Sequence, residues 1–353
     1  MISSIESLVQ QLVNELKITE FPKTRYYGSK RQHLSWIHAI TKNIEFETVL
    51  DVFGGTASVS LLFLKMGKKV TYNDNLKFNA ISADAILNKP NTNIIEECCE
   101  LIKDVVPYAG FVSNTFNGMY YTDEENMYID GFSRFIEKIN GPHKKVLYYG
   151  FFQACLSKRP YNLFHRANLN MRLKDTDRSF GNLTAWNKSF EKWITHNLRE
   201  FAKLDISGKC EIKCQDALDL ENNHDLVYLD PPYISNTKYT ESYLSRYHFL
   251  EGIVNFDVWN DLIDHNTKTK KFKDNYPENT WNNKSKTKEK LFELIAKHQK
   301  SKIVFSYCDK ACPSSEEIIE FMNSIFNTVD IHYKNSRHSL SKKDRNELIF
   351  IGR

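Results

Sequence analysis

The chain has 353 residues, of which 41% are hydrophobic and 26% charged, as in an ordinary soluble globular protein of about two domains. Lysine and arginine number 48 against 44 acidic residues, a net charge of +4, which is too small to indicate a nucleic-acid partner by itself. No stretch approaches the ~20 apolar residues of a membrane span, so we expect no transmembrane helix.

Residues 1–20 place apolar side chains at helical spacing, with Ser3 and Glu6 positioned as a capping box. This helix is not a signal peptide, because it lacks a basic start and an unbroken apolar run. The seven cysteines, an odd number, fit a reducing compartment better than a disulfide framework. Together these features predict a cytoplasmic protein.

Residues 47–88 alternate between strand and helix patterns. ETVLDV (47–52) and KKVTYND (68–74) read as strands, and each precedes a segment with apolar residues at helical spacing, TASVSLLFLKM and LKFNAISADAIL. A βαβα order of this kind is typical of a parallel sheet.

The alternation lapses between residues 89 and 202, which are aromatic, polar and basic with helical patches. It then returns in five strand-like segments: CEIKC (210–214), DLVYL (225–229), KIVFSYC (302–308), VDIHYK (329–334) and ELIFIG (347–352). The last two are joined by a polar loop too short for a crossover helix, so we expect them to be antiparallel. We therefore predict an α/β catalytic domain from residues 1–88 and 203–353, interrupted by a mainly helical region at 89–202.

The cysteine pairs Cys210/Cys214 and Cys308/Cys312 share a C-x3-C spacing that resembles part of a zinc site. CEIKC reads as a strand, however, and four strand residues separate its ends by ~13 Å, whereas thiolates that share one zinc ion lie within ~4 Å of each other. We therefore expect no metal site.

The first strand runs into Asp51-Val-Phe-Gly-Gly-Thr. Glycines at a strand-to-helix turn let the backbone approach a ligand and point helix amides at its anionic group, although a plain tight turn is the alternative. The pattern is not the dinucleotide G-x-G-x-x-G fingerprint. Asp74 ends the next strand, where doubly wound folds place an acid for ribose hydroxyls, so the two features together indicate a nucleoside-bearing cofactor.

The strand LVYL runs into Asp230-Pro231-Pro232-Tyr233. Open α/β folds bind ligands at the carboxyl ends of their strands. The prolines fix two φ angles and leave no amide N–H to compete for acceptors. Asp230 and a proline carbonyl then form two converging acceptors beside the flat face of Tyr233, an arrangement suited to a planar base with an exocyclic NH₂ group.

With these motifs the chain resembles the Dam-like adenine-N6 DNA methyltransferases (D12 class, alpha group), which use S-adenosyl-L-methionine. Four segments carry the resemblance in that group's order: YYGSKRQHLSWI (26–37), DVFGGTASVS, KRPYNLFHRANLNMRLKDTDRSFGN (158–182) and DPPY; CQDALDL and KKDRNELIFIG match more weakly. The first segment has Tyr-Gly-Ser-Lys where many relatives have Gly-Gly-Lys, which leaves the role of Ser29 open. The resemblance implies a Rossmann-like sheet and a target-recognition region at 89–202.

The resemblance also implies which residues bind the cofactor. It assigns the methionine end to Tyr27, Lys30, Asp51, Phe53, Gly54 and Gly55, the ribose to Asp74, the adenine edge to Asp216, and a cofactor contact to Asp230 as well. A lysine and a helix N-terminus near a carboxylate make electrostatic sense, although an exposed surface lysine is the alternative for Lys30.

In the implied mechanism, the Asp230 carboxylate and the Pro231 carbonyl accept the two hydrogens of the target amine and localise its lone pair for attack on the sulfonium methyl. Positive charge develops on the nitrogen, so a fixed anion stabilises the transition state. Because a duplex hides the amine, the base must be flipped out, with Tyr233 stacking on it.

Residues 158–178 hold six lysines and arginines against two acids. The resemblance makes this segment a DNA-binding candidate, whereas without it a solvated basic face is the plainer interpretation. The candidate contacts to phosphates or base edges are Arg159, Tyr161, Asn162, Arg166, Asn168, Lys174 and Arg178. The lysine-rich stretch 266–290 matches no motif and reads as nonspecific phosphate contacts or a mobile loop.

The sequence therefore predicts a DNA adenine-N6 methyltransferase acting on double-stranded DNA, and the family implies a restriction-modification role with a cognate endonuclease. Cytosine-N4 or RNA methylation is the nearest alternative, because two acceptors and a ring suit any exocyclic amine. Asp at the first position of the motif favours adenine. A nonenzymatic nucleic-acid-binding subunit and a nicotinamide-dependent oxidoreductase are the alternatives from other classes.

Overall fold

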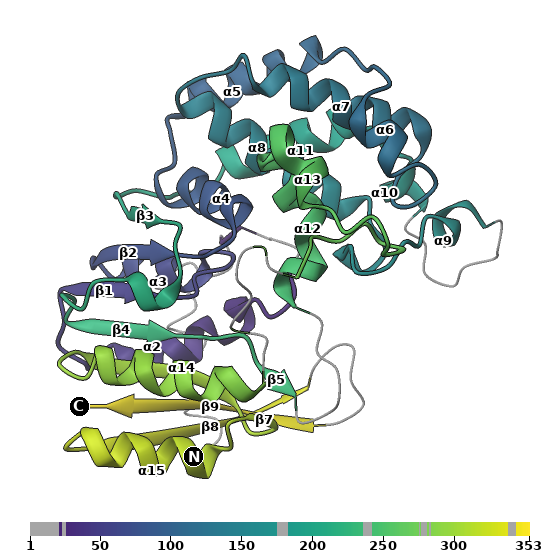
Figure 1. Cartoon of the computed structure of the whole chain (residues 1–353). Helices are drawn as coiled ribbons and strands as arrows, with labels where there is room; N and C mark the ends of the chain where they lie inside the picture. Colours follow the sequence, from purple (N-terminus) through teal and green to yellow (C-terminus); the bar gives the residue numbers. More distant parts are fainter. Residues whose placement is uncertain are drawn as a thin grey trace.

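A computed structural model describes residues 21–22, 26–174, 183–235, 242–274, 276, 281, 284–337 and 344–353. The helix predicted at residues 1–20 lies outside these residues. The protein is a mixed α/β molecule with a mostly parallel sheet at one end and a layer of helices at the other (Figure 1). In the described parts of the chain, no helix has the length and apolar character to cross a membrane.

The sheet has seven strands in the order β3-β2-β1-β4-β6-β9-β8. Their bounds are β1 Thr48–Asp51, β2 Lys69–Asn73, β3 Glu211–Lys213, β4 Leu226–Leu229, β6 Lys302–Cys308, β8 Val329–Arg337 and β9 Asp344–Gly352. The first five strands in this order pair in parallel, and β9 pairs antiparallel with both β6 and β8. This confirms the predicted strands and the antiparallel final hairpin.

The buried central strand β4 shows why these segments form the sheet. Its four residues alternate between two apolar clusters, Leu226 and Tyr228 in one and Val227 and Leu229 in the other, because successive side chains of a strand point to opposite faces. Both faces are covered by helices, as parallel sheets require. Helices α2, α3 and α4 contribute to the first cluster and α14 and α15 to the second.

The helices that flank the sheet are α2 Leu34–Thr41, α3 Ser58–Lys65, α4 Lys77–Leu87, α14 Lys284–Lys297 and α15 Ser315–Ile325. A short pair of strands that the sequence did not predict, β5 Ile234–Ser235 and β7 Ala311–Cys312, runs antiparallel beside the sheet. It directly follows the Asp-Pro-Pro-Tyr turn and ties that turn to the segment after β6.

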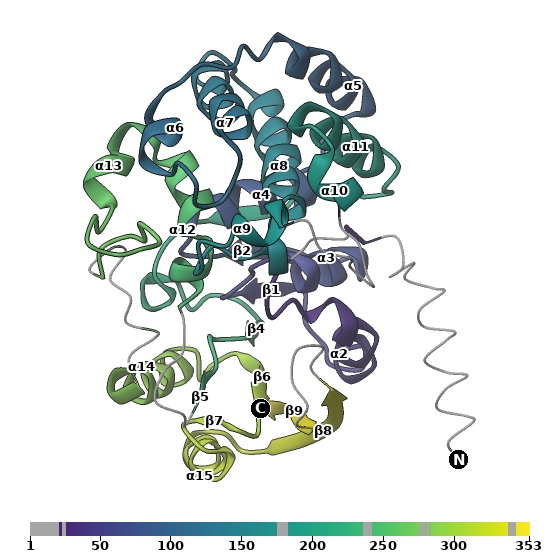
Figure 2. The same cartoon turned by 90° about the vertical axis from the view of Figure 1, so that its right-hand side faces the viewer.

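The helical layer is built from α5 Thr92–Leu101, α6 Phe111–Thr115, α7 Asp123–Ile136, α8 Pro142–Ser157, α9 Asn170–Leu173, α10 Leu183–Asn187 and α11 Phe190–Ala202. As predicted, residues 89–202 contain no strand where the structure describes them. The layer also includes α12 Tyr243–Val254 and α13 Trp259–Leu262, which follow β4 in the chain (Figure 2). Phe249 and Trp259 lie 5.1 Å from the ring of Phe116, so aromatic packing joins the two segments.

Short 3-10 helices complete the fold: η2 Lys30–His33, η3 Ile102–Asp104, η4 Pro160–Asn162, η5 Ala217–Asp219 and η6 Phe256–Val258. The chain order reverses between β1 and β4, because β2 and β3 lie on one side of β1 and the later strands on the other. Such a switch point opens a crevice at the carboxyl ends of the two strands.

Candidate functional site

A cavity opens at this switch point, and its walls come from distant parts of the chain. It is open to solvent and is lined by residues of η2, of the turn after β1, of the end of β2 and of the turn after β4. Asp51 at the end of β1 pairs in register with Tyr228 of β4. The acids predicted from three separate motifs, Asp51, Asp74 and Asp230, all line this cavity.

The glycine turn after β1 is shaped by a close approach to β2. A β-carbon on Gly54 would lie 2.1 Å from the ring of Tyr72, and Gly55 has a left-handed φ of +48°, so both positions favour glycine. The Gly55 amide donates a hydrogen bond to Asp74 Oδ2 at 3.0 Å. Burial raises the pKa of Asp74 to about 6. Asp74 therefore fastens the glycine turn as well as facing the cavity.

Asp51 is a buried carboxylate with one oxygen left for a ligand. Its side chain is 1% exposed, and Oδ2 accepts a hydrogen bond from the Ser60 hydroxyl at 2.6 Å. Oδ1 has no hydrogen-bond partner among the described residues. Burial raises the pKa of Asp51 to about 7, and the charges of Asp230 and Asp74 add to this effect. Since an unpaired buried carboxylate is destabilising, this oxygen is suited to a cationic group.

Asp230 belongs to a partly buried charge cluster with Lys30 and Tyr233. The Lys30 ammonium lies 3.1 Å from Asp230 Oδ1 and donates to the Tyr233 hydroxyl at 2.8 Å. That hydroxyl donates in turn to Asp230 Oδ1 at 3.0 Å. In the described part of the chain these contacts converge on Oδ1, which leaves Oδ2 for a ligand. Lys30 is therefore not the exposed surface lysine that was the alternative interpretation. It lines the cavity and also contacts Asp230 and Tyr233.

The cluster includes a second carboxylate that the sequence did not single out. Glu347 Oε2 of β9 lies 3.5 Å from the Lys30 ammonium. Burial disfavours the charged lysine, but Asp230 and Glu347 outweigh it and hold the pKa of Lys30 above its ordinary value. Burial raises the pKa of Asp230, and Lys30 opposes this rise. Lys30 therefore favours the ionised form of Asp230.

The first motif segment, residues 26–37, lies over the cavity. The tyrosine of this segment that lines the cavity is not the one predicted to bind the cofactor. Tyr26, rather than Tyr27, lines the cavity, with its ring stacked on that of Tyr247 at 4.5 Å. The Tyr27 ring instead faces the guanidinium of Arg246 at 3.8 Å. The contact of Tyr27 with the methionine end of the cofactor therefore stays a prediction. Ser29, whose role was open, accepts a hydrogen bond from the Arg31 amide and caps η2.

A second cavity adjoins the first. Phe53, Asp74, Pro232 and Tyr243 line both cavities, and Trp281 lines the second. The Trp281 and Phe53 rings meet edge to face at 5.0 Å. Asp216 does not line either cavity; its carboxylate accepts from the Leu218 amide and the Trp281 indole. Asp216 therefore positions the wall of the second cavity, and its direct contact with the adenine edge stays a prediction.

Comparison with known proteins agrees with this geometry. Residues 26–253 match the family of D12 class N6 adenine-specific DNA methyltransferases. The chain belongs to this family. It is 26% identical over 348 residues to Type II methyltransferase M2.HphI of Haemophilus parahaemolyticus, covering 94% of this chain and 98% of that protein. It is also 26% identical over 323 residues to modification methylase LlaI of Lactococcus lactis subsp. lactis, covering 84% of this chain and 48% of that protein.

The protein is therefore an adenine-specific DNA methyltransferase, and enzymes of this family use S-adenosylmethionine. The donor set in the crevice fits such a group. An unpaired buried carboxylate oxygen faces its cavity, a glycine turn too close to a neighbouring ring for a side chain forms its floor, and two aromatic rings form the wall of the adjoining cavity.

The basic segment of the methyltransferase, residues 158–174, is partly structural. Arg159 is 2% exposed, and its guanidinium donates to the carbonyls of Tyr120, Leu163 and Arg166. Burial lowers the pKa of Arg159 to about 10. The prediction that Arg159 contacts DNA is therefore corrected: its donors are used to fold the segment.

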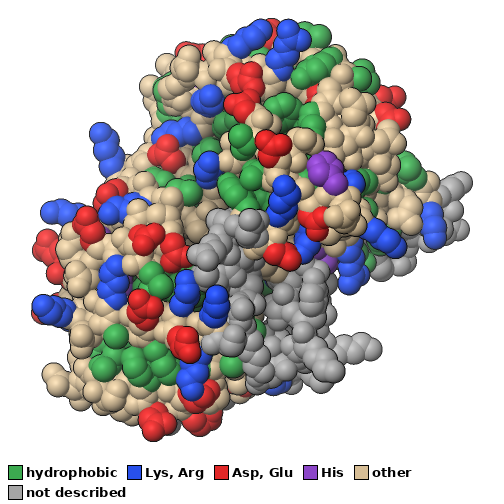
Figure 3. All heavy atoms as spheres, in the orientation of Figure 1, with side chains coloured by type: hydrophobic (Ala, Val, Ile, Leu, Met, Phe, Trp, Pro, Cys, Tyr) green, Lys and Arg blue, Asp and Glu red, His purple; other side chains and the backbone are tan. Residues whose placement is uncertain are grey.

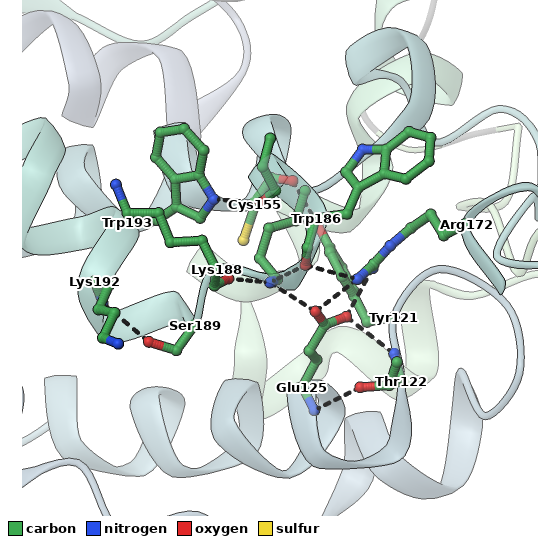
Figure 4. Close-up of polar contacts among 12 residues, drawn as sticks. Tyr121, Thr122, Glu125, Cys155, Arg172, Trp186, Lys188, Ser189, Lys192 and Trp193 are labelled. Carbon is green, nitrogen blue, oxygen red and sulfur yellow. Dashed lines mark hydrogen bonds and ion pairs between the residues drawn. The ribbon is translucent and has the colours of Figure 1, made fainter. Parts of the chain in front are cut away.

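A second buried network holds the end of the segment. Arg172 makes two hydrogen bonds of 2.7 Å to the Glu125 carboxylate, and Figure 4 shows these groups facing each other beside Trp186. The Lys158 ammonium lies 2.7 Å from Glu125 Oε1 and 2.7 Å from the Trp186 carbonyl. Glu125 also completes the capping box of α7 with Thr122. One carboxylate thus joins α7, α8 and α9.

The remaining DNA-binding candidates divide into exposed and buried residues. Tyr161 is 61% exposed, although its φ of +60° is unusual for a side chain other than glycine. Arg166 and Lys174 are also exposed. Asn162 is half-buried with a φ of +58°, and Asn168 is buried. Arg178 lies outside the described residues.

Proposed function

We propose that this methyltransferase binds S-adenosylmethionine in the crevice between β1 and β4 and methylates the N6 amine of an adenine flipped out of duplex DNA. The observation that carries the proposal is the position of Asp230. One of its oxygens is held by Lys30 and Tyr233, while its side chain lines the same cavity as Asp51. The amine and the methyl donor would therefore meet at the end of β4.

The cofactor would be held by residues on both sides of the switch point. Asp51 Oδ1 would take its ammonium group, and the glycine turn would follow its methionine end. Asp74 already accepts two amide hydrogen bonds, but a carboxylate offers about four acceptor sites, so it can still accept from ribose hydroxyls. Phe53 and Trp281 would enclose the adenine ring. When bound, the cofactor supplies an electrophilic methyl group on its sulfonium sulfur.

Asp230 and the Pro231 carbonyl would accept the two hydrogens of the target amine. Two acceptors converging on an NH₂ group localise the nitrogen lone pair, and the anionic carboxylate stabilises the positive charge that develops there. Tyr233 would stack on the flipped base, with its hydroxyl fixed by Lys30 and Asp230. Lys30 would keep the carboxylate ionised inside a buried site.

Target recognition would fall to the helical region 89–202. Lys and Arg side chains gather at the lower right of the helical region in Figure 3. Among the candidates in residues 158–174, Tyr161, Arg166 and Lys174 are exposed. Their contacts with phosphates and base edges would offset the few kcal/mol that base flipping costs. The buried Arg159 and Arg172 would support these residues without touching DNA.

The two relatives are named as a type II methyltransferase and a modification methylase. We propose the corresponding role here: methylation of one specific sequence that protects host DNA from a cognate restriction endonuclease. Methylation of DNA in cells, followed by sequencing of the modified positions, would identify that sequence.

The direct test incubates the protein with tritiated cofactor and genomic DNA, digests the DNA to nucleosides and identifies the labelled one. We expect the label in N6-methyladenine. Label in N4-methylcytosine, or in RNA supplied in parallel and absent from DNA, would replace this proposal with the corresponding alternative. Cofactor binding without transfer to any nucleic acid would favour a nonenzymatic subunit.

A further inference from the structure

A compact basic hairpin follows α13, beyond the residues that match the family. Residues 264–273, here named the lysine hairpin, fold back so that Ile263 and Phe272 form an antiparallel bridge. The Asp264 amide donates to the Lys271 carbonyl, and the Lys273 amide donates to the Leu262 carbonyl, both at 2.8 Å. The family match covers residues 26–253 and does not include this element.

The lysine hairpin concentrates positive charge at the surface. It contains Lys268, Lys270, Lys271 and Lys273 against one acid, Asp264. Lys268 and Lys273 are exposed, and Lys270 and Lys271 are half-buried. Lys270 has a φ of +51°, a conformation that side chains other than glycine rarely adopt and that often marks functional turns.

The side-chain contacts of these lysines are weak ones at the surface. Lys270 donates to the carbonyl of His265 and Lys273 to the carbonyl of Asp261 in α13, and Lys271 pairs with Asp274 across three residues. Exposed contacts of this kind contribute little, about 0–1 kcal/mol. The ammonium groups can therefore exchange these partners for phosphate oxygens.

One buried tyrosine ties the hairpin to residues 158–174, here named the recognition segment. The Tyr120 hydroxyl lies 2.7 Å from the Thr269 carbonyl of the hairpin and 2.8 Å from the Phe164 carbonyl of the recognition segment. His248 Nε2 lies 3.2 Å from the same hydroxyl. Phe272 packs in the core, 6.3 Å from the His248 ring. The hairpin and the recognition segment are therefore held in a fixed relationship by the same buried groups.

The field at His248 shows that positive charge from both elements converges there. Burial, together with the charges of Arg159, Lys271 and His165, lowers the pKa of His248 to about 3, although the hydrogen bond with the Phe164 carbonyl opposes this shift. His248 therefore stays neutral and adds no charge of its own. Figures 1 and 2 place the hairpin on the side of the helical layer that faces the sheet, at the level of α9. Duplex DNA held by the recognition segment would lie against this side.

We propose that the lysine hairpin is a second DNA-binding element, which contacts backbone phosphates of the duplex held by residues 158–174. The inference rests on the proposed function, because it assumes a duplex on that segment. The hairpin offers ammonium groups without a planar fork for base edges, so it adds affinity and orientation but no sequence preference.

The test compares Lys268→Ala/Lys270→Ala with a matched control, Lys42→Ala/Lys209→Ala. Both control lysines are exposed and precede β1 and β3, at the opposite end of the strands. Affinity for a labelled duplex of randomised sequence is measured between about 50 and 200 mM salt. We expect the hairpin variant to bind more weakly at every salt concentration, with the log–log salt slope reduced by about two, one for each phosphate that a removed lysine would have neutralised. The control should match the wild type.

An unchanged slope, or an equal loss of affinity in the control, overturns the proposal. So does a loss seen on single-stranded DNA of the same sequence but not on the duplex. Melting temperatures and cofactor affinity, measured in parallel, should be equal in all variants. A wild type that binds duplex through the hairpin but transfers no methyl group would contradict the proposed function alone. Full methylation with normal binding by the hairpin variant would contradict the hairpin alone.

Discussion

The Lys30 ammonium lies 3.1 Å from the carboxylate of Asp230, and this pair joins the amino-terminal motif to the Asp-Pro-Pro-Tyr turn. The lysine is 8% exposed. A buried ion pair of this kind is weak as a source of stability but strongly sets the protonation of its members. In the proposed function, the first motif would therefore act on the methyl-accepting side of the site as well as on the cofactor.

Replacement of Asp230 by alanine should abolish methyl transfer while leaving cofactor affinity largely intact. Loss of one preorganised electrostatic partner lowers the rate by about 10²–10³, and Asp51 and the glycine turn remain in place. Single-turnover transfer of tritiated methyl to DNA, with cofactor binding by calorimetry, measures both quantities. Turnover near the wild-type rate would show that this carboxylate has no role in the reaction.

Lys30→Met and Glu347→Gln should move the pH profile in opposite directions. Lys30 lowers the pKa of Asp230 and Glu347 raises it, and the proposed reaction needs the ionised carboxylate. The acidic limb of kcat should therefore shift to higher pH without the lysine and to lower pH without the Glu347 charge. Measurement of kcat between pH 5 and 9 in both variants tests this prediction, since a shift of about half a pH unit can be resolved. Shifts of the same sign in both variants would contradict it.

Asp51→Asn should remove a pH dependence from cofactor binding. Asp51 has a pKa of about 7 in the ligand-free protein, so protonation below that pH removes the anion that faces the cavity. Cofactor affinity should rise with pH through 7 in the wild type and stay flat in the variant. The raised carboxyl pKa also means that folding stability falls as pH rises from the unfolded value toward 7. At pH 8 the ligand-free variant should melt no lower than the wild type.

Arg159→Ala and Arg166→Ala should have different effects, because Arg159 stabilises the fold and Arg166 is expected to contact DNA. Arg159 donates to carbonyls inside the recognition segment, so its loss leaves buried acceptors unpaired and should destabilise the fold by about 2–4 kcal/mol. Arg166 is exposed, so its loss should weaken DNA binding and flatten the salt dependence without a change in melting temperature. The reverse pattern would return Arg159 to the DNA-binding residues.

The strand segments and the Asp-Pro-Pro-Tyr turn could be predicted from the sequence because they follow from local rules, whereas the order of the strands in the sheet was not predicted. LVYL is continuous and apolar since a central parallel strand is buried on both faces, and Pro231 and Pro232 fix a turn wherever they occur. The glycine turn after Asp51 could be predicted for a similar reason, because Gly54 and Gly55 admit a backbone approach that other residues forbid. The order of these features along the chain also indicated the family.

Only the tertiary structure decided which charges meet. Lys30 and Arg159 look alike in the sequence as basic residues within motifs, yet one pairs with Asp230 and the other with backbone carbonyls. Glu347 and Trp281 reach the site from segments whose local pattern gives no sign of it. The partners and the burial of an ionisable side chain depend on how distant segments pack, and desolvation then sets its pKa. Neither the partners nor the burial of a side chain can be read from the residues next to it in the chain.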